Sequence, residues 1–167
     1  MDANDKYACA ELIQAWGLYR DQGKWPQLLA TFVPEGQIAV SWFSGSFREF
    51  VDRCRQSFEA GQRSKHLIFP SVVRLAGDRA LAETNIVILV RQKIVGVLAD
   101  MTSHARFLDR LERRGGRWGI AERDGSTRLN PRRRSKSCSR RATSRSIPRL
   151  TATWPPASTP PGARSRP

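Results

Sequence analysis

The spacing of apolar residues predicts three helices in the first half of the chain. A first helix is expected near residues 4–20, and a short second helix opens at Trp25 and Pro26. A third amphipathic helix is closed at Gly61. The apolar residues that set these spacings are Ala8, Leu12, Ile13, Trp16 and Tyr19 in the first helix, Leu28, Leu29 and Phe32 in the second, and Phe47, Phe50, Val51, Cys54 and Phe58 in the third.

Alternation, β-branched residues and turn sequences predict five strands. Pro34, Glu35 and Gly36 are expected to stop the second helix. The strands are predicted over residues 37–43, 66–75, 80–90, 95–112 and 117–123. The first lies between the second and third helices, and the other four form an antiparallel meander with tight turns. This order predicts an α+β fold in which helices cover one face of a strongly curved sheet.

The periodic pattern ends near Gly125, where the composition changes. Residues 126–167 hold eleven of the 29 Lys and Arg residues, seven of the ten prolines and no acid, so most of the net charge of +14 lies there. This segment cannot bury enough apolar surface to offset the cost of ordering it. We therefore expect one folded domain over residues 1–125, which is long enough to bury a core, and a disordered basic tail over residues 126–167.

Three origins stay open for the tail. Its mixture of Arg, Ser, Pro, Thr and Ala is typical of an out-of-frame reading of GC-rich DNA, and this frameshift interpretation is favoured. A solvated extension is the second interpretation. The third is nucleic-acid binding through the run from Arg132 to Lys136. A nucleic-acid partner is not expected.

Several classes of protein are excluded by missing patterns. Three cysteines without paired spacing argue against a disulfide framework or a cysteine zinc site. The longest apolar run, residues 86–90, is far too short to span a membrane, and the acidic N-terminus is unlike a signal peptide. GxGxxG, GxxxxGK[ST], GxSxG and HExxH patterns are all absent. The sequence predicts a cytoplasmic protein that needs no metal, no cofactor and no membrane.

Few residues are suited to acid–base chemistry. The chain has two histidines, His66 at the start of a predicted strand and His104 in the middle of a longer one, and Asp21 stands where the first helix ends. A carboxylate beside an imidazole orients it and raises its basicity, which makes a general base. The simpler alternative is that Asp21 caps a turn and His66 is a half-exposed strand residue.

The chain resembles the SnoaL-like, nuclear transport factor two-like superfamily. Four segments carry the resemblance, in the order and spacing of that fold, over about residues 5–125. They are the helix joint from Tyr19 to Leu29, the phrase from Ala30 to Gly36, the turn Gly77 to Ala80 and the final hairpin from Leu108 to Ile120, in which Gly116 and Trp118 precede the last strand. The resemblance implies a cone-shaped mixed or antiparallel sheet covered by three N-terminal helices.

Within that superfamily, the chain is most similar to the branch of scytalone dehydratase, bile acid 7α-dehydratase and hexachlorocyclohexane dehydrochlorinase. Those enzymes use an Asp at the helix joint and a His on the first meander strand as a base dyad, and Asp21 and His66 stand at these two positions. Trp16 stands where a tyrosine is expected. Glu83, Thr84 and Asn85 stand where scytalone dehydratase has a second His, so the acid for a leaving group is not carried over.

The inward residues of such a cone would line a pocket for a small, largely apolar molecule. Trp16, Trp42, Phe43 and Phe69 are expected on its apolar wall, although each could instead be plain core. Asn85 or Thr84 could donate a neutral hydrogen bond, and His104 could line the pocket or face solvent.

The sequence therefore predicts a cofactor-independent lyase or isomerase of the dehydratase type, with Asp21 and His66 as its catalytic pair. The resemblance implies a homodimer or homotrimer formed through the outer face of the sheet. The alternative is a non-catalytic ligand-binding or assembly module, since one fold serves many functions.

Overall fold

A computed structural model describes residues 2–126, which form three helices and seven strands. The helices are α1 (Asp2–Asp21), α2 (Trp25–Leu29) and α3 (Phe47–Glu59). The strands are β1 (Phe32–Val40), β2 (Phe43–Ser46), β3 (Arg63–Ile68), β4 (Val72–Ala76), β5 (Arg79–Ile94), β6 (Val97–Arg114) and β7 (Arg117–Ser126). Apart from its first residue, the predicted tail lies outside the described residues.

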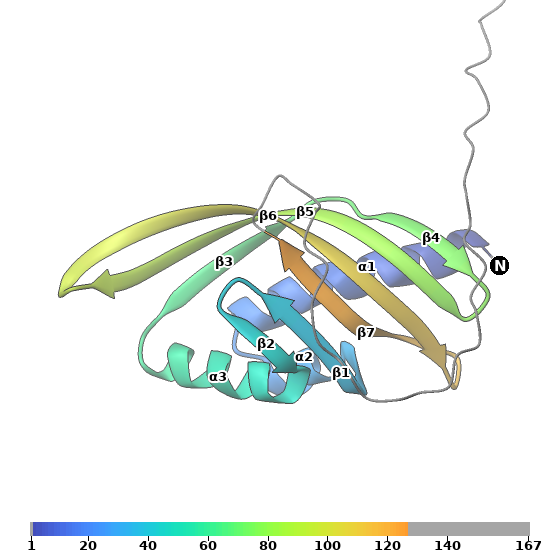
Figure 1. The fold of residues 1–167 in the computed structure, drawn as a ribbon, viewed down its shortest axis with the longest axis horizontal. Coiled ribbons are helices and arrows are strands. Elements are labelled where there is room, and N and C mark those ends of the chain that lie inside the picture. The colour runs from blue at the N-terminus through green and yellow to red at the C-terminus, as the bar shows by residue number, and fades with distance from the viewer. Residues whose placement is uncertain (1, 127–167) are drawn as a thin grey trace, which may run out of the picture. The chain divides into compact units, whose positions relative to one another are not determined.

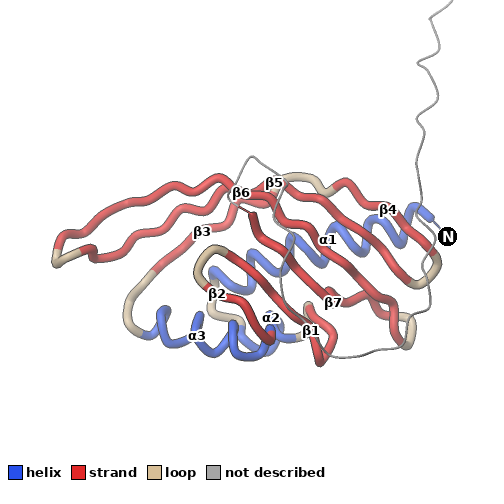
Figure 2. Tube along the Cα trace, in the orientation of Figure 1, coloured by secondary structure: helices blue, strands red, loops and turns tan. Residues whose placement is uncertain are grey.

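The strands form one open, mixed sheet in the order β2-β1-β7-β6-β5-β3, and β4 also pairs with β5. β1 and β7 are parallel, and the other paired strands are antiparallel. Figure 1 shows this sheet curving over α1, with the β5–β6 hairpin projecting beyond the other strands. In Figure 2, α1 crosses the sheet behind β7, and α2 and α3 lie next to β1 and β2. The prediction of an α+β fold with a curved sheet and N-terminal helices is confirmed.

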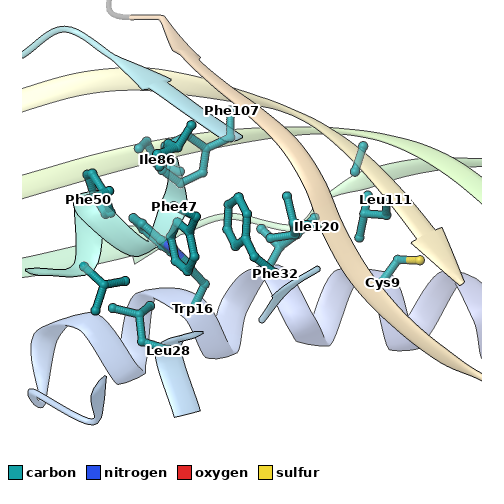
Figure 3. Close-up of a cluster of buried hydrophobic side chains, with 14 of the residues drawn as sticks. Cys9, Trp16, Leu28, Phe32, Phe47, Phe50, Ile86, Phe107, Leu111 and Ile120 are labelled. Atoms are coloured by element: carbon teal, nitrogen blue, oxygen red, sulfur yellow. The ribbon is translucent and has the colours of Figure 1, made fainter. Parts of the chain in front are cut away.

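Helix α1 is held against the sheet by its apolar stripe. Cys9, Ile13 and Trp16 are fully or almost fully buried, and Figure 3 shows Cys9 and Trp16 in the core between α1 and the strands. Gly17 permits a close approach to β3, because a Cβ there would lie 2.5 Å from Cδ1 of Ile68. Among residues 2–126, no helix is both long and apolar enough to span a membrane.

The predicted second helix is longer than the real one. Helix α2 ends at Leu29, and Phe32 begins strand β1 instead of facing inward from a helix. The cause is a distant partner: the amide of Ile120 in β7 donates to the carbonyl of Thr31, and β1 then runs parallel to β7. Pro34, Glu35 and Gly36, expected as a helix stop, lie within β1. Phe32 packs flat on Phe47, with ring centroids 3.6 Å apart.

Two further strand predictions were wrong in their limits. The single strand predicted over residues 66–75 is two strands, β3 and β4, separated around Pro70, which lacks an amide proton for a sheet. The strand predicted over residues 37–43 ends at Val40, and a turn at Ser41 and Trp42 leads into the unpredicted strand β2.

Candidate active site

The end of α1 is fixed by a glycine in the left-handed conformation. Gly23 has a φ of 68°, the amide of Lys24 donates to the carbonyl of Tyr19, and the amide of Gly23 donates to the carbonyl of Arg20. This pair of bonds is the Schellman arrangement, which ends a helix sharply. It leaves Asp21 as the last helical residue, where a carboxylate faces the negative end of the helix dipole. A charge in that place needs donors from elsewhere.

Those donors come from strand β3. Oδ2 of Asp21 accepts a bond of 2.6 Å from the main-chain amide of His66, and Oδ1 lies 2.6 Å from Nδ1 of the same residue. The hydroxyl of Ser64 also donates to Oδ1, at 3.3 Å. The close packing of α1 on β3 at Gly17 brings these groups together. Asp21 is therefore both a tie between helix and strand and the partner of the His66 ring.

The hydrogen bond to Asp21 sets the protonation of His66. An ionised carboxylate only accepts, so Nδ1 carries the proton and Nε2 of the neutral ring has a free lone pair. Within residues 2–126, Nε2 has no hydrogen-bond partner, and the ring lies edge-on to Trp16. The His66 side chain is only 5 % exposed, and this burial lowers its pKa below 6.5. Asp21 opposes the shift, while the positive charges of Arg20 and Arg123 add to it.

His66 forms part of the wall of a cavity of about 420 Å³. The cavity lies between α1, α3, the β1–β2 turn and strands β3, β5 and β6, and it is within the size range of small-molecule sites. Most of its wall is apolar. The apolar lining residues are Trp16, Val40, Trp42, Phe50, Ile86, Ile88, Val90, Met101, Ala105 and Phe107, and the polar ones are Arg20, Ser41, Ser57, Gln62, Ser64, His66, Gln92 and Ser103.

Of the four aromatic residues expected on the wall, Trp16 and Trp42 line the cavity. Trp42 is half exposed and stacks on Phe50 at a centroid distance of 5.3 Å. Phe43 and Phe69 do not line it. Phe43 begins β2 and contacts both Trp42 and Phe50, at centroid distances of 5.9 and 5.7 Å. Phe69 follows β3 with 49 % of its surface exposed.

Neither Asn85 nor His104 reaches the cavity. Both are exposed, because the alternation of β5 and β6 turns them to the outer face of the sheet. Asn85 accepts a bond from Arg106 there, and His104 pairs with Val87. Thr84 faces inward instead, but its hydroxyl bonds to Ser71 outside the cavity lining.

A buried ion pair behind the cavity wall was not predicted. Arg123 and Asp109 are both fully buried and joined by two hydrogen bonds of 2.6 and 3.0 Å. The guanidinium carbon lies 4.0 Å from the ring centroid of Phe107 and 4.4 Å from that of Trp16. Nη1 of Arg123 and Nε1 of Trp16 are buried without a partner among the described residues. Burial raises the pKa of the Asp109 carboxyl, and Arg123 opposes this rise.

A β-bulge explains why Arg123 escaped the sequence pattern. Strict alternation from Trp118 and Ile120 would turn Glu122 into the core. The register between β6 and β7 instead shifts after Ile120, so that Glu122 faces solvent and Arg123 faces Asp109. An extra residue in one strand exchanges the two faces beyond it. The one sequence signal for this ion pair was an Asp at position 109 on the inward face of a strand, because a buried carboxylate needs a cation.

The described residues offer no ready metal site. Within residues 2–126, no three side chains of His, Cys, Asp or Glu are grouped closely enough to hold an ion.

A curved sheet covered by N-terminal helices, with a histidine–aspartate pair on the wall of a cavity between them, defines a cone-type α+β protein. A model of the SnoaL-like domain matches residues 1–124. The chain belongs to the SnoaL-like domain family, which confirms the resemblance drawn from its sequence.

Two curated relatives come from the fungus Fusarium vanettenii. A PEP2-like protein is 26 % identical over 133 residues, covering 74 % of this chain and 57 % of the relative. Pea pathogenicity protein 2 is 24 % identical over 139 residues, covering 77 % and 59 %. The chain therefore spans less than two thirds of the length of these relatives.

The similarity to solved structures concerns the fold. A protein from Novosphingobium aromaticivorans, provisionally described as a scytalone dehydratase, has a TM-score of 0.65 at 13 % identity, over 83 % of this chain and 95 % of that one. A cystatin-like protein of unknown function from Nostoc punctiforme has a TM-score of 0.61 at 19 % identity, over 75 % and 92 %.

Proposed function

We propose that this protein is a cofactor-independent lyase or isomerase that acts on a small, largely apolar molecule. In this proposal Asp21 orients and polarises His66, and Nε2 of His66 removes a proton from a substrate carbon. The observation that carries the proposal is the 2.6 Å contact between Nδ1 of His66 and Asp21, made by a ring whose other nitrogen is unpaired on a cavity wall. A general base needs a free lone pair that a bound substrate can approach to hydrogen-bond distance, and a free Nε2 on a cavity wall meets this need.

The proton balance follows from the tautomer. Nε2 accepts the proton, and the imidazolium that results is stabilised by the carboxylate of Asp21. The electron pair left on carbon forms a double bond to the next atom. In an elimination the bond from that next atom to a hydroxyl or halide breaks; a departing hydroxyl takes the proton back from Nε2 and leaves as water, and a halide leaves as the anion. In an isomerisation the proton returns from Nε2 to a different carbon. The similarity of fold to a protein provisionally described as a scytalone dehydratase favours elimination of water.

The apolar wall supports this chemistry. Ile86, Ile88 and Phe107 line the same cavity as His66, so an apolar part of a substrate can pack beside the base. Burial keeps His66 neutral at pH 7, and therefore ready to accept a proton.

Proton abstraction can be tested without knowing the substrate. The protein is incubated in D2O with a panel of small hydroxy-ketones, halogenated hydrocarbons and enones, and NMR detects deuterium at carbon, water loss or halide release. We expect His66→Ala to slow the reaction of any responsive compound by about 100-fold or more. His104→Ala is the matched control, because the second histidine lies on the outer face. Compounds that bind but never exchange or eliminate would favour a ligand-binding module.

The quaternary structure is proposed on separate grounds. Exposed apolar side chains lie on the outer face of the sheet, among them Leu67, Leu81 and Leu108, and Phe69 follows directly after β3. Exposed apolar groups of this kind are typical of protein contacts. We propose a homodimer or homotrimer through this face, and sedimentation of the wild type and of Leu108→Arg would test it. A cytoplasmic location stays a prediction from the sequence.

A further inference from the structure

The cavity wall carries one permanent positive charge. Arg20 precedes Asp21 on α1 and lines the cavity. Its Nη1 donates to the hydroxyl of Ser64 at 3.1 Å, and its other polar neighbour is the thiol of Cys54. Within residues 2–126, no carboxylate lies at ion-pair distance from it. A guanidinium has five N–H donors in a planar fork, so most of its capacity is unused.

Asp21 does not neutralise this charge by direct contact. Its two oxygens accept from the main-chain amide of His66, from Nδ1 of His66 and from the hydroxyl of Ser64. Neither Asp nor Glu belongs to the cavity lining formed by the described residues. The wall that a ligand meets is therefore positive at Arg20 and uncharged elsewhere when His66 is neutral.

The strand register places the polar residues at one end of the cavity. In the inward face of the sheet, His66 lies beside Ile88, and Ser64 lies beside Val90 one step further along. Beyond that step, Gln62 donates to Gln92 at 3.3 Å. In the opposite direction the inward positions become apolar, with Ile86 paired to Ala105. The apolar residues Val90 and Met101 also line the cavity beside Ser64, so this end is mixed. His66 thus stands between an end that carries Arg20 and the other polar side chains, and an end that is apolar.

We propose that this polar end, formed by Arg20, Ser64, Gln62 and Gln92, binds a carboxylate of the substrate, so that the protein acts on apolar acids. This inference rests on the proposed function for its catalytic part. The fork of Arg20 matches the two oxygens of a carboxylate, and a half-buried cation without an anionic partner favours an anionic ligand. Because Ser64 and His66 are two residues apart on one strand, the carboxylate would bind roughly 7 Å from the base. The hydrocarbon part of the same molecule would then occupy the apolar end.

Binding of matched acids and amides tests this inference. Isothermal titration calorimetry of the full chain would use 3-phenylpropanoate with 3-phenylpropanamide, and 2-naphthoate with 2-naphthamide, at pH 7.5 and low salt. We expect at least one acid to bind about tenfold or more tightly than its amide. Arg20→Gln should abolish that preference and leave the affinity for the amide within about twofold.

Two control variants separate this site from other effects. Arg48→Gln removes the same charge from an exposed position on α3 outside the cavity, and it should keep the preference for the acid. His66→Ala should also keep it, so loss of catalysis and loss of carboxylate binding are distinguishable.

Arg20→Lys is a second variant, in case Arg20→Gln does not fold. It keeps the positive charge and loses the planar pair of donors of the guanidinium. It should weaken acid binding several-fold without weakening amide binding. Equal affinities for acid and amide, no binding of either acid, or an acid preference that survives in Arg20→Gln would overturn the inference.

Discussion

The carboxylate of Asp21 contacts two nitrogens of His66. Oδ1 lies 2.6 Å from the ring nitrogen Nδ1, and Oδ2 lies 2.6 Å from the main-chain amide. The ring bond fixes which nitrogen carries the proton, and the main-chain bond fixes where strand β3 lies relative to the end of α1. One carboxylate therefore sets both the chemistry and the position of the imidazole.

Replacing Asp21 by Asn should abolish most activity while keeping the fold. An amide cannot accept from both nitrogens, and its NH2 group would favour a proton on Nε2, which removes the base. We expect turnover to fall at least about 100-fold and stability to fall by about 1–3 kcal/mol. Kinetics and urea unfolding measure the two effects. Asp52→Asn, at an exposed position on α3, is the control. An unchanged rate in Asp21→Asn would refute a role in catalysis.

The rate should depend on pH through His66. Burial lowers its pKa despite the opposing effect of Asp21, so in the proposed mechanism the base is available at neutral pH and is lost only in acid. We expect kcat/KM to be level at neutral pH and above and to fall in acid, with a midpoint under 6.5. NMR titration of the ring nitrogens gives the same midpoint directly. A midpoint above 7 would contradict the dominance of burial.

Stability should follow the same group. The folded state keeps His66 neutral, whereas the unfolded chain takes up a proton near pH 6.5. The free energy of unfolding is therefore unaffected by this group above pH 6.5 and decreases as the pH falls below it. Urea unfolding of the wild type and His66→Gln at pH 5 and pH 7.5 tests this. A wild type that loses no more stability in acid than the variant would argue against it.

The buried pair of Asp109 and Arg123 should be costly to break. Arg123→Met leaves an uncompensated carboxylate in the core, and we expect a loss of about 3–5 kcal/mol in urea unfolding. The double variant with Asp109→Leu should recover much of this loss, because no charge is then buried alone. Additive losses in the double variant would show that the two residues do not depend on each other.

The tail should contribute little to folding. The core described for residues 2–126 includes every strand of the sheet, and β7 ends at Ser126. A chain shortened after Ser126 should unfold within about 1 kcal/mol of the full chain. A loss above about 2 kcal/mol would show that the tail packs on the domain.

Binding of nucleic acid by the full chain should be electrostatic. The tail supplies eleven positive charges and one tryptophan, Trp154, without a pattern for reading bases. Affinity for a duplex should fall steeply with salt and disappear in the shortened chain. Sequence-selective binding by residues 1–126 would contradict this.

The sequence by itself determined the elements that depend on local patterns. The apolar stripe of α1, the apolar face of α3 and the end of α3 near Gly61 are all properties of neighbouring residues. The resemblance of four segments to the SnoaL-like superfamily identified the family from the sequence. It also pointed to Asp21 and His66, whose catalytic roles stay predictions. These features could be found because helix periods and turn residues act over a few positions.

Only the tertiary structure decided features that depend on distant partners. Phe32 left the predicted helix because β7 pairs with β1, more than eighty residues away. The bulge near Ile120 turned Arg123 inward, and strand alternation turned Asn85 and His104 outward. Arg20 meets Ser64 across 44 positions of the chain. Register and strand partners decide which face a side chain takes, and no local pattern carries that information.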